Sequence, residues 1–368
     1  MEKKIVWVDF DTMERFMADA FMAAGVPPED AAICAEVLIT ADKLGIDSHG
    51  INRLKAIYLD RIKAGTQEPV TRMEIVKEGP TTAVIDGHNG MGHVVGKKSM
   101  QMAIDKAGKY GMGMVAVRNS THYGIAGFYT LMAVKSGMIG IAGTNARPSI
   151  APTFGVENML GTNPLTFSLP TDEEFPFFLD CATSVSQRGK VEVYARGGKK
   201  VPDGWVINQE GRSANDAESI LKDLVNGSNA LVPLGGIGEE TAGYKGYGYA
   251  TVVEILSAAL QGGSFLKMLT GIKDGRPAPI PLGHFFIAVD ISAFTELEEF
   301  KKTAGQILRE LRASKKMPGA ERIYTPGEKE HLLWMEQRSK GVPLNRDLQA
   351  EVKAIAKEYN LTGFVFPF

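Results

Sequence analysis

Hydrophobic residues recur at helical spacing through the N-terminal part of the chain. A first helix is predicted by apolar residues three or four positions apart: Met13, Phe16, Met17, Ala20 and Phe21. Asp11 or Thr12 would cap this helix, and Gly25 would end it. Two further helices are expected over residues 27–45 and 51–65, with the polar stretch GIDSHGINR at the corner between them.

From about residue 72 onward the pattern becomes that of strands. TTAVIDG alternates in hydrophobicity, while GMGMVAV, GMIGIAGTN, FFLDCAT and HFFIAVDI are short apolar runs. Helical spacing returns over residues 96–109 and 129–136. Further on, Thr295 and Glu298 have the spacing of a capping box, and the apolar face of that helix would be Leu297, Phe300, Ile307 and Leu311.

These elements predict an α/β chain of the α+β type with two parts. A last helix is expected over residues 345–359. Residues 1–72 and 295–368 would form a helical domain from both chain ends, and residues 73–294 a mixed α/β domain. The length of 368 residues also favours two domains, because one hydrophobic core rarely serves so many.

Composition narrows the function classes. Hydrophobic residues make up 44% and charged residues 23%, as in soluble globular proteins, and the net charge of -2 gives no electrostatic case for nucleic acid or an anionic membrane. The two cysteines and the lack of a signal peptide or a membrane-spanning run predict a cytoplasmic location.

The stretch TTAVIDGHNGMGHVVG resembles the start of a dinucleotide-binding unit but fails the test. Gly90, Gly92 and Gly96 are one residue out of register for G-x-G-x-x-G, and the next strand ends in Arg118 and Asn119 where an acidic residue is needed. We therefore interpret the loop as a turn that leads into a helix.

Candidate chemistry gathers in two motifs, DSHGINR and NSTHYGIAG. His49 and His122 can exchange protons near neutrality, Ser48 adjoins His49, and the planar guanidinium of Arg53 can bind a carboxylate through two hydrogen bonds. A structural histidine and a solvated arginine are the alternatives at these positions. No H-E-x-x-H or G-x-S-x-G occurs, so a metalloprotease-type zinc site and a serine hydrolase are not expected, and no metal site is predicted.

Glycine-rich segments later in the chain add to these motifs. GTNPLTFSLP contains Thr162 and Asn163, and LDCATSVSQRGK contains Asp180 and Lys190. Asp180 would raise the thiol pKa of its neighbour Cys181, which makes a poor nucleophile. In GYKGYG, Lys245 opens a helix, where a lysine and free amides favour an anion.

In this order the motifs resemble the type-2 malate/L-lactate dehydrogenase family, which includes sulfolactate and ureidoglycolate dehydrogenases and cyclic-imine reductases. The resemblance covers about nine-tenths of the chain, through DSHGINR, NSTHYGIAG, GTNPLTFSLP, LDCATS, VPDGW, YKGYG and TPGE. It implies a non-Rossmann, mostly antiparallel sheet that binds NAD or NADP. It also implies a helical substrate and dimerisation domain, and a homodimer whose active site lies near the subunit contact.

The resemblance also implies roles for single residues. His122 would accept the proton, with His49 and Ser48 as further catalytic residues, and Arg53 would bind the substrate carboxylate. The other expected substrate contacts are Thr162, Asn163 and Lys190. The expected cofactor contacts are His122, Tyr123, Gly124, Ile125, Ala126, Asp180, Cys181, Ala182, Lys245, Gly327 and Glu328.

Lys190 departs from the imine-reductase branch, which has an aspartate there. A lysine cannot complete a Ser-His-Asp relay, which favours a 2-hydroxy acid, and it could neutralise a second carboxylate such as that of malate. The sequence thus predicts an NAD-dependent enzyme, with NADP possible, that oxidises a 2-hydroxy acid to the 2-keto acid. L-lactate, sulfolactate or ureidoglycolate as substrate, and a non-catalytic dinucleotide-sensing protein, are the alternatives.

Overall fold

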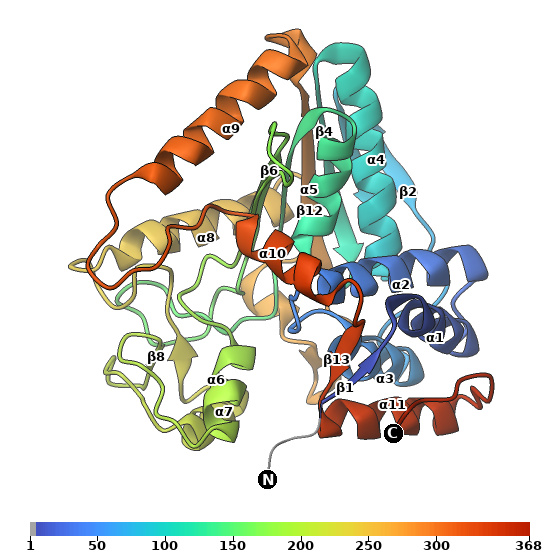
Figure 1. The fold of residues 1–368 in the computed structure, drawn as a ribbon. Coiled ribbons are helices and arrows are strands. Elements are labelled where there is room, and N and C mark those ends of the chain that lie inside the picture. Colours follow the sequence, from blue (N-terminus) through green and yellow to red (C-terminus); the bar gives the residue numbers. More distant parts are fainter. Residues whose placement is uncertain (1–4) are drawn as a thin grey trace.

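The computed structural model describes residues 5–368, and a seven-stranded mixed sheet lies at its centre (Figure 1). The order is β2-β3-β4-β12-β5-β6-β7. The strands are β2 (Glu74–Glu78), β3 (Thr82–Asp86), β4 (Met112–Ser120), β5 (Met138–Thr144), β6 (Leu165–Leu169), β7 (Phe177–Cys181) and β12 (Leu282–Asp290). Within this sheet β3 and β4 run parallel, and every other neighbouring pair is antiparallel. The α/β class predicted from the sequence is confirmed.

Helices pack on both faces of the sheet. α4 (Gly92–Tyr110) and α5 (Ala126–Lys135) share an apolar core with Phe286 and Ala288 of β12. Gly283 of the same strand meets α8 (Gly243–Ala258), where an added β-carbon would lie 1.6 Å from the carbonyl oxygen of Ser257. Because alternate residues of a strand point to opposite faces, α8 covers the face opposite α4 and α5.

The two chain ends meet in one hydrophobic core. It joins α1 (Phe10–Ala23), α2 (Pro28–Lys43), β13 (Val342–Leu344) and α11 (Arg346–Glu358). β1 (Val6–Val8) pairs with β13, and the ring of Phe16 meets those of Phe364 and Phe366 edge-on at 5.3 and 5.2 Å. The helices expected over residues 27–45 and 345–359 are confirmed.

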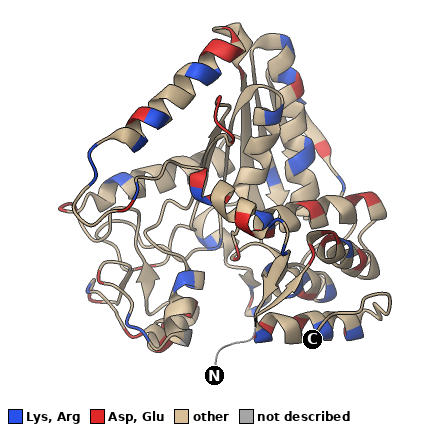
Figure 2. Ribbon diagram, viewed as in Figure 1, with Lys and Arg blue, Asp and Glu red and all other residues tan. Residues whose placement is uncertain are grey.

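Smaller elements complete the fold. α6 (Arg188–Arg196) and α7 (Ala217–Asn226) pack on the pair β8 (Val206–Ile207) and β9 (Ala230–Leu231), with Val191 and Ile220 in a shared core. The remaining elements are η3 (Leu266–Leu269), β10 (Ile272–Lys273), β11 (Arg276–Pro277), η4 (Ile291–Ala293) and α10 (Glu328–Gln337). Charged residues of both signs occur along the outer helices α4, α9 and α11 (Figure 2).

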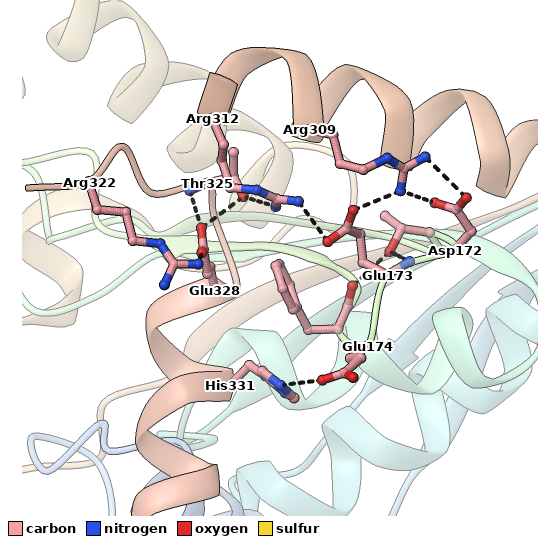
Figure 3. A network of polar contacts seen from close by, with 11 residues as sticks. Asp172, Glu173, Glu174, Arg309, Arg312, Arg322, Thr325, Glu328 and His331 are labelled. Carbon is pink, nitrogen blue, oxygen red and sulfur yellow. Dashed lines mark hydrogen bonds and ion pairs between the residues drawn. The ribbon is translucent and has the colours of Figure 1, made fainter. Parts of the chain in front are cut away.

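α9 (Leu297–Ala313) packs on the connection between β6 and β7, away from α1 and α2 (Figure 1). Arg309 bonds to Asp172 at 2.8 Å, and Arg312 bonds to Glu173 at 2.7 Å (Figure 3). Gly305 permits this approach, since an added β-carbon would lie 1.7 Å from Asp172 Oδ1. Of the segment 295–368, β13 and α11 join the N-terminal core, whereas α9 does not.

Two predicted helix caps are wrong. α1 is capped by Asp9, whose carboxylate accepts from the amide of Thr12 at 2.9 Å, so the helix begins before the expected caps Asp11 and Thr12. At α9 the residue before the helix is Glu296, and no side chain caps it, so Thr295 and Glu298 form no capping box.

The predicted apolar face of α9 is also partly wrong. Ile307 and Leu311 are each 54% exposed, while Gly305 and Leu308 are buried. The side that faces the strand connection is the one that carries the small Gly305, because the helix must approach Asp172 closely there.

The glycine loop before α4 is a turn that leads into a helix, as expected. Gly92 begins α4, and its amide donates to Thr121 Oγ1 at 2.9 Å. A β-carbon on Gly92 would lie 2.3 Å from the carbonyl oxygen of Thr121 and 2.5 Å from that of His122. The absence of a side chain lets the helix support the His122 loop directly.

Gly92→Ala should therefore lower the free energy of unfolding by about 1–3 kcal/mol, the usual cost of overpacking. Gly108→Ala in the same helix is the control, because its β-carbon would meet only Met138 Cε at 3.7 Å. That control should be neutral or stabilising, since alanine favours a helix over glycine by about 1 kcal/mol. Urea denaturation measures both; equal effects of the two variants would contradict the close approach at Gly92.

Candidate active site

The corner after α2 is built around the buried carboxylate of Asp42. Asp42 Oδ2 accepts from the amide of Ile51 at 3.0 Å, and a β-carbon on Gly50 would lie 1.8 Å from Asp42 Oδ1. Burial raises the pKa of Asp42 to about 8. The carboxyl group and the missing side chain together set where the segment with His49 turns into the next helix.

The helix predicted over residues 51–65 is confirmed but has three forms. It begins as a 3-10 turn, η1 (Ile51–Arg53), continues as a π-helix, η2 (Leu54–Leu59), and ends as α3 (Asp60–Lys63). A π-helix bonds residues five apart, and such turns are frequent at functional sites. Tyr58 lies in this π turn, where the charge of Arg53 acts on its hydroxyl.

The structure brings Ser48, His49, Arg53 and His122 together. The rings of His49 and His122 stack with centroids 5.6 Å apart and an angle of 14° between planes. Ser48 Oγ lies 2.8 Å from His49 Nδ1, and Arg53 Nε donates to the carbonyl oxygen of Ser48 at 2.5 Å. His122 comes from the loop between β4 and α5. Two motifs far apart in the sequence thus form one cluster.

Tyr58 holds the inner nitrogen of His122. Its Oη lies 2.5 Å from His122 Nδ1, and its ring lies 4.5 Å from the buried ring of His93. Burial raises the pKa of the Tyr58 hydroxyl, which therefore keeps its proton. His122 Nε2 is the ring nitrogen that Tyr58 leaves available.

Both catalytic candidates are neutral imidazoles. Burial, followed by the charge of Arg53, lowers the pKa of His49 to about 4. Burial also holds the pKa of His122 well below its usual value, with His49 and Arg61 contributing further. Each residue is nevertheless only half-buried, so a small molecule can reach it.

Arg53 and Arg61 lie near these rings, and Arg147 lies near Arg61. Among residues 5–368, no carboxylate forms an ion pair with Arg53, Arg61 or Arg147. Burial and the charge of Arg147 lower the pKa of Arg61, and the charge of Arg61 acts on His122 and Tyr58. A positive cluster without counter-ions can accept an anion.

Other predicted substrate residues have protein partners. Asn163 is buried, and its Nδ2 donates to Glu254 Oε2 at 2.8 Å and to the carbonyl oxygen of Ala250 at 3.0 Å. The carbonyl oxygen of Thr162 accepts from the amide of Thr183 at 3.0 Å, and the Thr162 side chain is half-buried. The amide nitrogen of Asn163 therefore already has two hydrogen-bond acceptors within the fold.

Lys190 is exposed on α6. Its Nζ lies 5.6 Å from the centroid of the Trp205 ring, and no contact to His49 or His122 is present. The neighbouring Gly189 does approach the cluster, because a β-carbon there would lie 4.0 Å from Arg53 Nη2. The start of α6 thus borders the arginine side of the cluster.

The predicted cofactor segments adjoin one another. Asp180 at the end of β7 accepts from the amide of Gly127, in the first turn of α5, at 2.8 Å. The amide of Phe178 donates to the carbonyl oxygen of Pro326 at 3.3 Å, which places the PGE turn against β7. The amide of Leu234, before α8, donates to the carbonyl oxygen of Thr183 at 2.9 Å. Asp180, at the end of β7, therefore adjoins the start of α5 next to residues 122–126, whereas the turn before α10 lies against Pro176 and Phe178 at the beginning of β7.

Side chains in these segments differ in their availability. Lys245 is exposed in the first turn of α8, which no side chain caps. Glu328 is 1% exposed, and its carboxylate is engaged by Arg322 and by the amide of Thr325 (Figure 3). Cys181 is exposed, and partial burial of its sulfur together with Asp180 raises its thiol pKa, as expected for a poor nucleophile.

Sequence reasoning missed Tyr58 and Arg61. Both lie in INRLKAIYLDRIKAG, which was interpreted only as a helix. Helical periodicity gave no signal for either residue, because the π turn changes which residues share a helix side. Among the described residues no group of three or more His, Cys, Asp or Glu could hold a metal ion, and none of their helices is long and apolar enough to cross a membrane.

Comparison with known proteins agrees over nearly the whole chain. Residues 8–353 match the family model for malate/L-lactate dehydrogenase. Malate dehydrogenase from Pyrococcus horikoshii is 45% identical over 99% of this chain and 98% of its own. L-sulfolactate dehydrogenase from Methanocaldococcus jannaschii is 38% identical over 95% and 96%.

A solved structure gives the same result. The crystal structure of malate dehydrogenase from Entamoeba histolytica superposes with a TM-score of 0.95 at 45% identity, covering 99% of this chain and 100% of that one. The resemblance noted in the sequence is thereby confirmed, and the chain belongs to the malate/L-lactate dehydrogenase family.

Proposed function

We propose that the protein transfers a hydride between a 2-hydroxy carboxylate, foremost malate, and a nicotinamide dinucleotide, NAD rather than NADP. One observation carries this: a neutral imidazole, His122, lies beside arginines that have no acidic partner. A proton acceptor next to a carboxylate-binding group is what oxidation of a hydroxy acid requires. The relatives named malate dehydrogenase support malate over lactate, sulfolactate and ureidoglycolate.

His122 Nε2 takes the proton of the substrate hydroxyl. To act as a base, Nε2 must be unprotonated, which requires the tautomer whose ring proton is on Nδ1 and is donated to Tyr58 Oη. In that tautomer the amide of Gly124, 3.4 Å from Nδ1, donates to Tyr58 Oη and not to the ring. Burial keeps the ring neutral before the reaction, and Tyr58 fixes its orientation. A bound nicotinamide ring supplies the acceptor for the hydride from the carbinol carbon.

Arg53 binds the carboxylate beside the carbinol. Its Nε is already bonded to the carbonyl oxygen of Ser48, so both terminal nitrogens are free for a two-point hydrogen bond. Each charge-assisted bond contributes about 1.5–3 kcal/mol. His49, held by Ser48 Oγ, orients the hydroxyl from the other side of the stacked pair.

The segments along β7 and at the start of α8 would bind the dinucleotide. No side chain caps the first turn of α8, where the exposed Lys245 supplies a positive charge suited to a phosphate. Residues 122–126, the 180–182 strand end and the turn at Gly327 and Glu328 would hold the rest of the cofactor. We propose that residues 73–294 form this non-Rossmann cofactor domain, and that the protein is a cytoplasmic homodimer. Thr162, Asn163 and Lys190 stay proposed substrate contacts.

His122→Asn should lower kcat for malate oxidation by about 10²–10⁴-fold, the usual contribution of a positioned base. His88→Asn is the matched control, because His88 is an exposed histidine that bonds to Glu74 at 2.9 Å. Steady-state rates with malate and NAD measure both variants. Activity of His122→Asn within twofold of wild type would remove His122 from this role.

The pH dependence follows from the lowered imidazole pKa values. A base must be neutral to act, and the pKa of His49 is about 4 while that of His122 is also far below 6.5. kcat/KM for malate, which reports the free enzyme, should therefore stay level as pH falls through 6.5 and decline only in more acidic solution. A decline centred near pH 6.5–7 that His122→Asn abolishes would contradict burial of the base.

Arg53→Leu should raise KM for malate by about 10²-fold through loss of its charge-assisted bonds, and leave KM for NAD nearly unchanged. Arg188→Leu is the control, since Arg188 is an exposed arginine paired with Glu192. Initial rates with each substrate varied in turn give both constants. A rise confined to KM for NAD would show that Arg53 serves the cofactor.

A further inference from the structure

Arg61 is a charged residue of the site that the sequence did not single out. It lies three residues after Tyr58, in the first turn of α3, so the two side chains project from the same side of the helix. Tyr58 in turn touches His122 at 2.5 Å. Arg61 is half-buried, and its charge acts on His122, Tyr58 and Arg147.

Arg61 has no acidic partner in the described part of the chain. Lys55 and Lys63 in the same helical segment are paired, with Asp60 at 2.6 Å and with Glu358 at 2.5 Å. Arg61, between them in the sequence, forms no such pair, although Asp60 is its direct neighbour. A half-buried guanidinium without a counter-ion is costly unless a ligand supplies the negative charge.

The charges around the imidazoles exceed what one carboxylate would need. Arg53 suffices for the carboxylate next to the carbinol, yet Arg61 and Arg147 remain. Lys190, expected from the sequence to neutralise a second carboxylate, lies over the Trp205 ring instead. The further positive charge near His122 comes from Arg61, on α3, and Arg147, just after β5, acts in turn on Arg61.

We propose that Arg61, with Arg147 beside it, forms a second anion subsite that binds the distal carboxylate of a dicarboxylic 2-hydroxy acid and so determines substrate specificity. This inference rests on the proposed function and names its substrate class. A dicarboxylate fills both subsites at once. A monocarboxylate such as lactate leaves the Arg61 guanidinium desolvated and unpaired, which a site rejects strongly.

Kinetics with malate and lactate test the subsite. Arg61→Leu should lower kcat/KM for malate by about 10²-fold or more and leave kcat/KM for lactate within about threefold of wild type. Arg61→Lys should recover part of the loss. Arg147→Leu, at an exposed position, should give a smaller change of the same kind, and it tests the subsite even if Arg61→Leu folds poorly. Arg188→Leu is the control, because Arg188 is exposed and paired with Glu192, and it should leave the malate-to-lactate ratio unchanged.

A binding measurement separates this inference from the proposed reaction. Succinate should raise the melting temperature of the wild-type protein, butyrate of the same length should not, and Arg61→Leu should abolish the succinate effect. Dicarboxylate binding through Arg61 without turnover of any hydroxy acid would support the subsite and refute the dehydrogenase proposal. Two results would overturn the subsite in an enzyme that turns over malate. One is an equal loss of kcat/KM for malate and for lactate in Arg61→Leu. The other is a fall of the malate-to-lactate ratio in Lys190→Leu and not in Arg61→Leu.

Discussion

The removal of two imidazoles from water beside arginines that lack counter-ions is the constraint on which this site depends. Burial disfavours the charged form of His122 and His49, and the neighbouring guanidinium groups disfavour it further. Arginine, by contrast, stays protonated under the same conditions. The cluster therefore presents a neutral proton acceptor within a positive field, which attracts an oxyacid and leaves the base ready to accept its proton.

The surrounding fold keeps this unfavourable arrangement in place through short, specific contacts. The Asp42 carboxylate and Gly50 position one motif, and Gly92 lets a helix end support the backbone of the other. Tyr58 then joins the two by its contact with His122. Each of these contacts fixes the position of the group that it touches. A catalytic base requires such precise positioning.

Most of the fold and part of the candidate site could be predicted from the sequence. Apolar periodicity revealed the strands and most helices, and unusual polar residues in glycine-flanked corners revealed His49, Arg53 and His122. Tyr58 and Arg61 escaped because a π turn shifts which residues share a helix side, and periodicity analysis assumes 3.6 residues per turn. The caps of α1 and α9 failed since capping depends on where the chain enters the helix, which tertiary contacts decide.

Histidine protonation measured directly is the sharpest test of the central claim. Nuclear magnetic resonance of ring-labelled histidine, without substrate and with His122→Asn for assignment, follows each imidazole as pH changes. We expect the resonances of His49 and His122 to remain those of neutral rings well below pH 6.5, with His49 titrating at about 4. A midpoint at or above 6.5 for either ring would show that burial and the arginines do not control the base, and would contradict the proposed site.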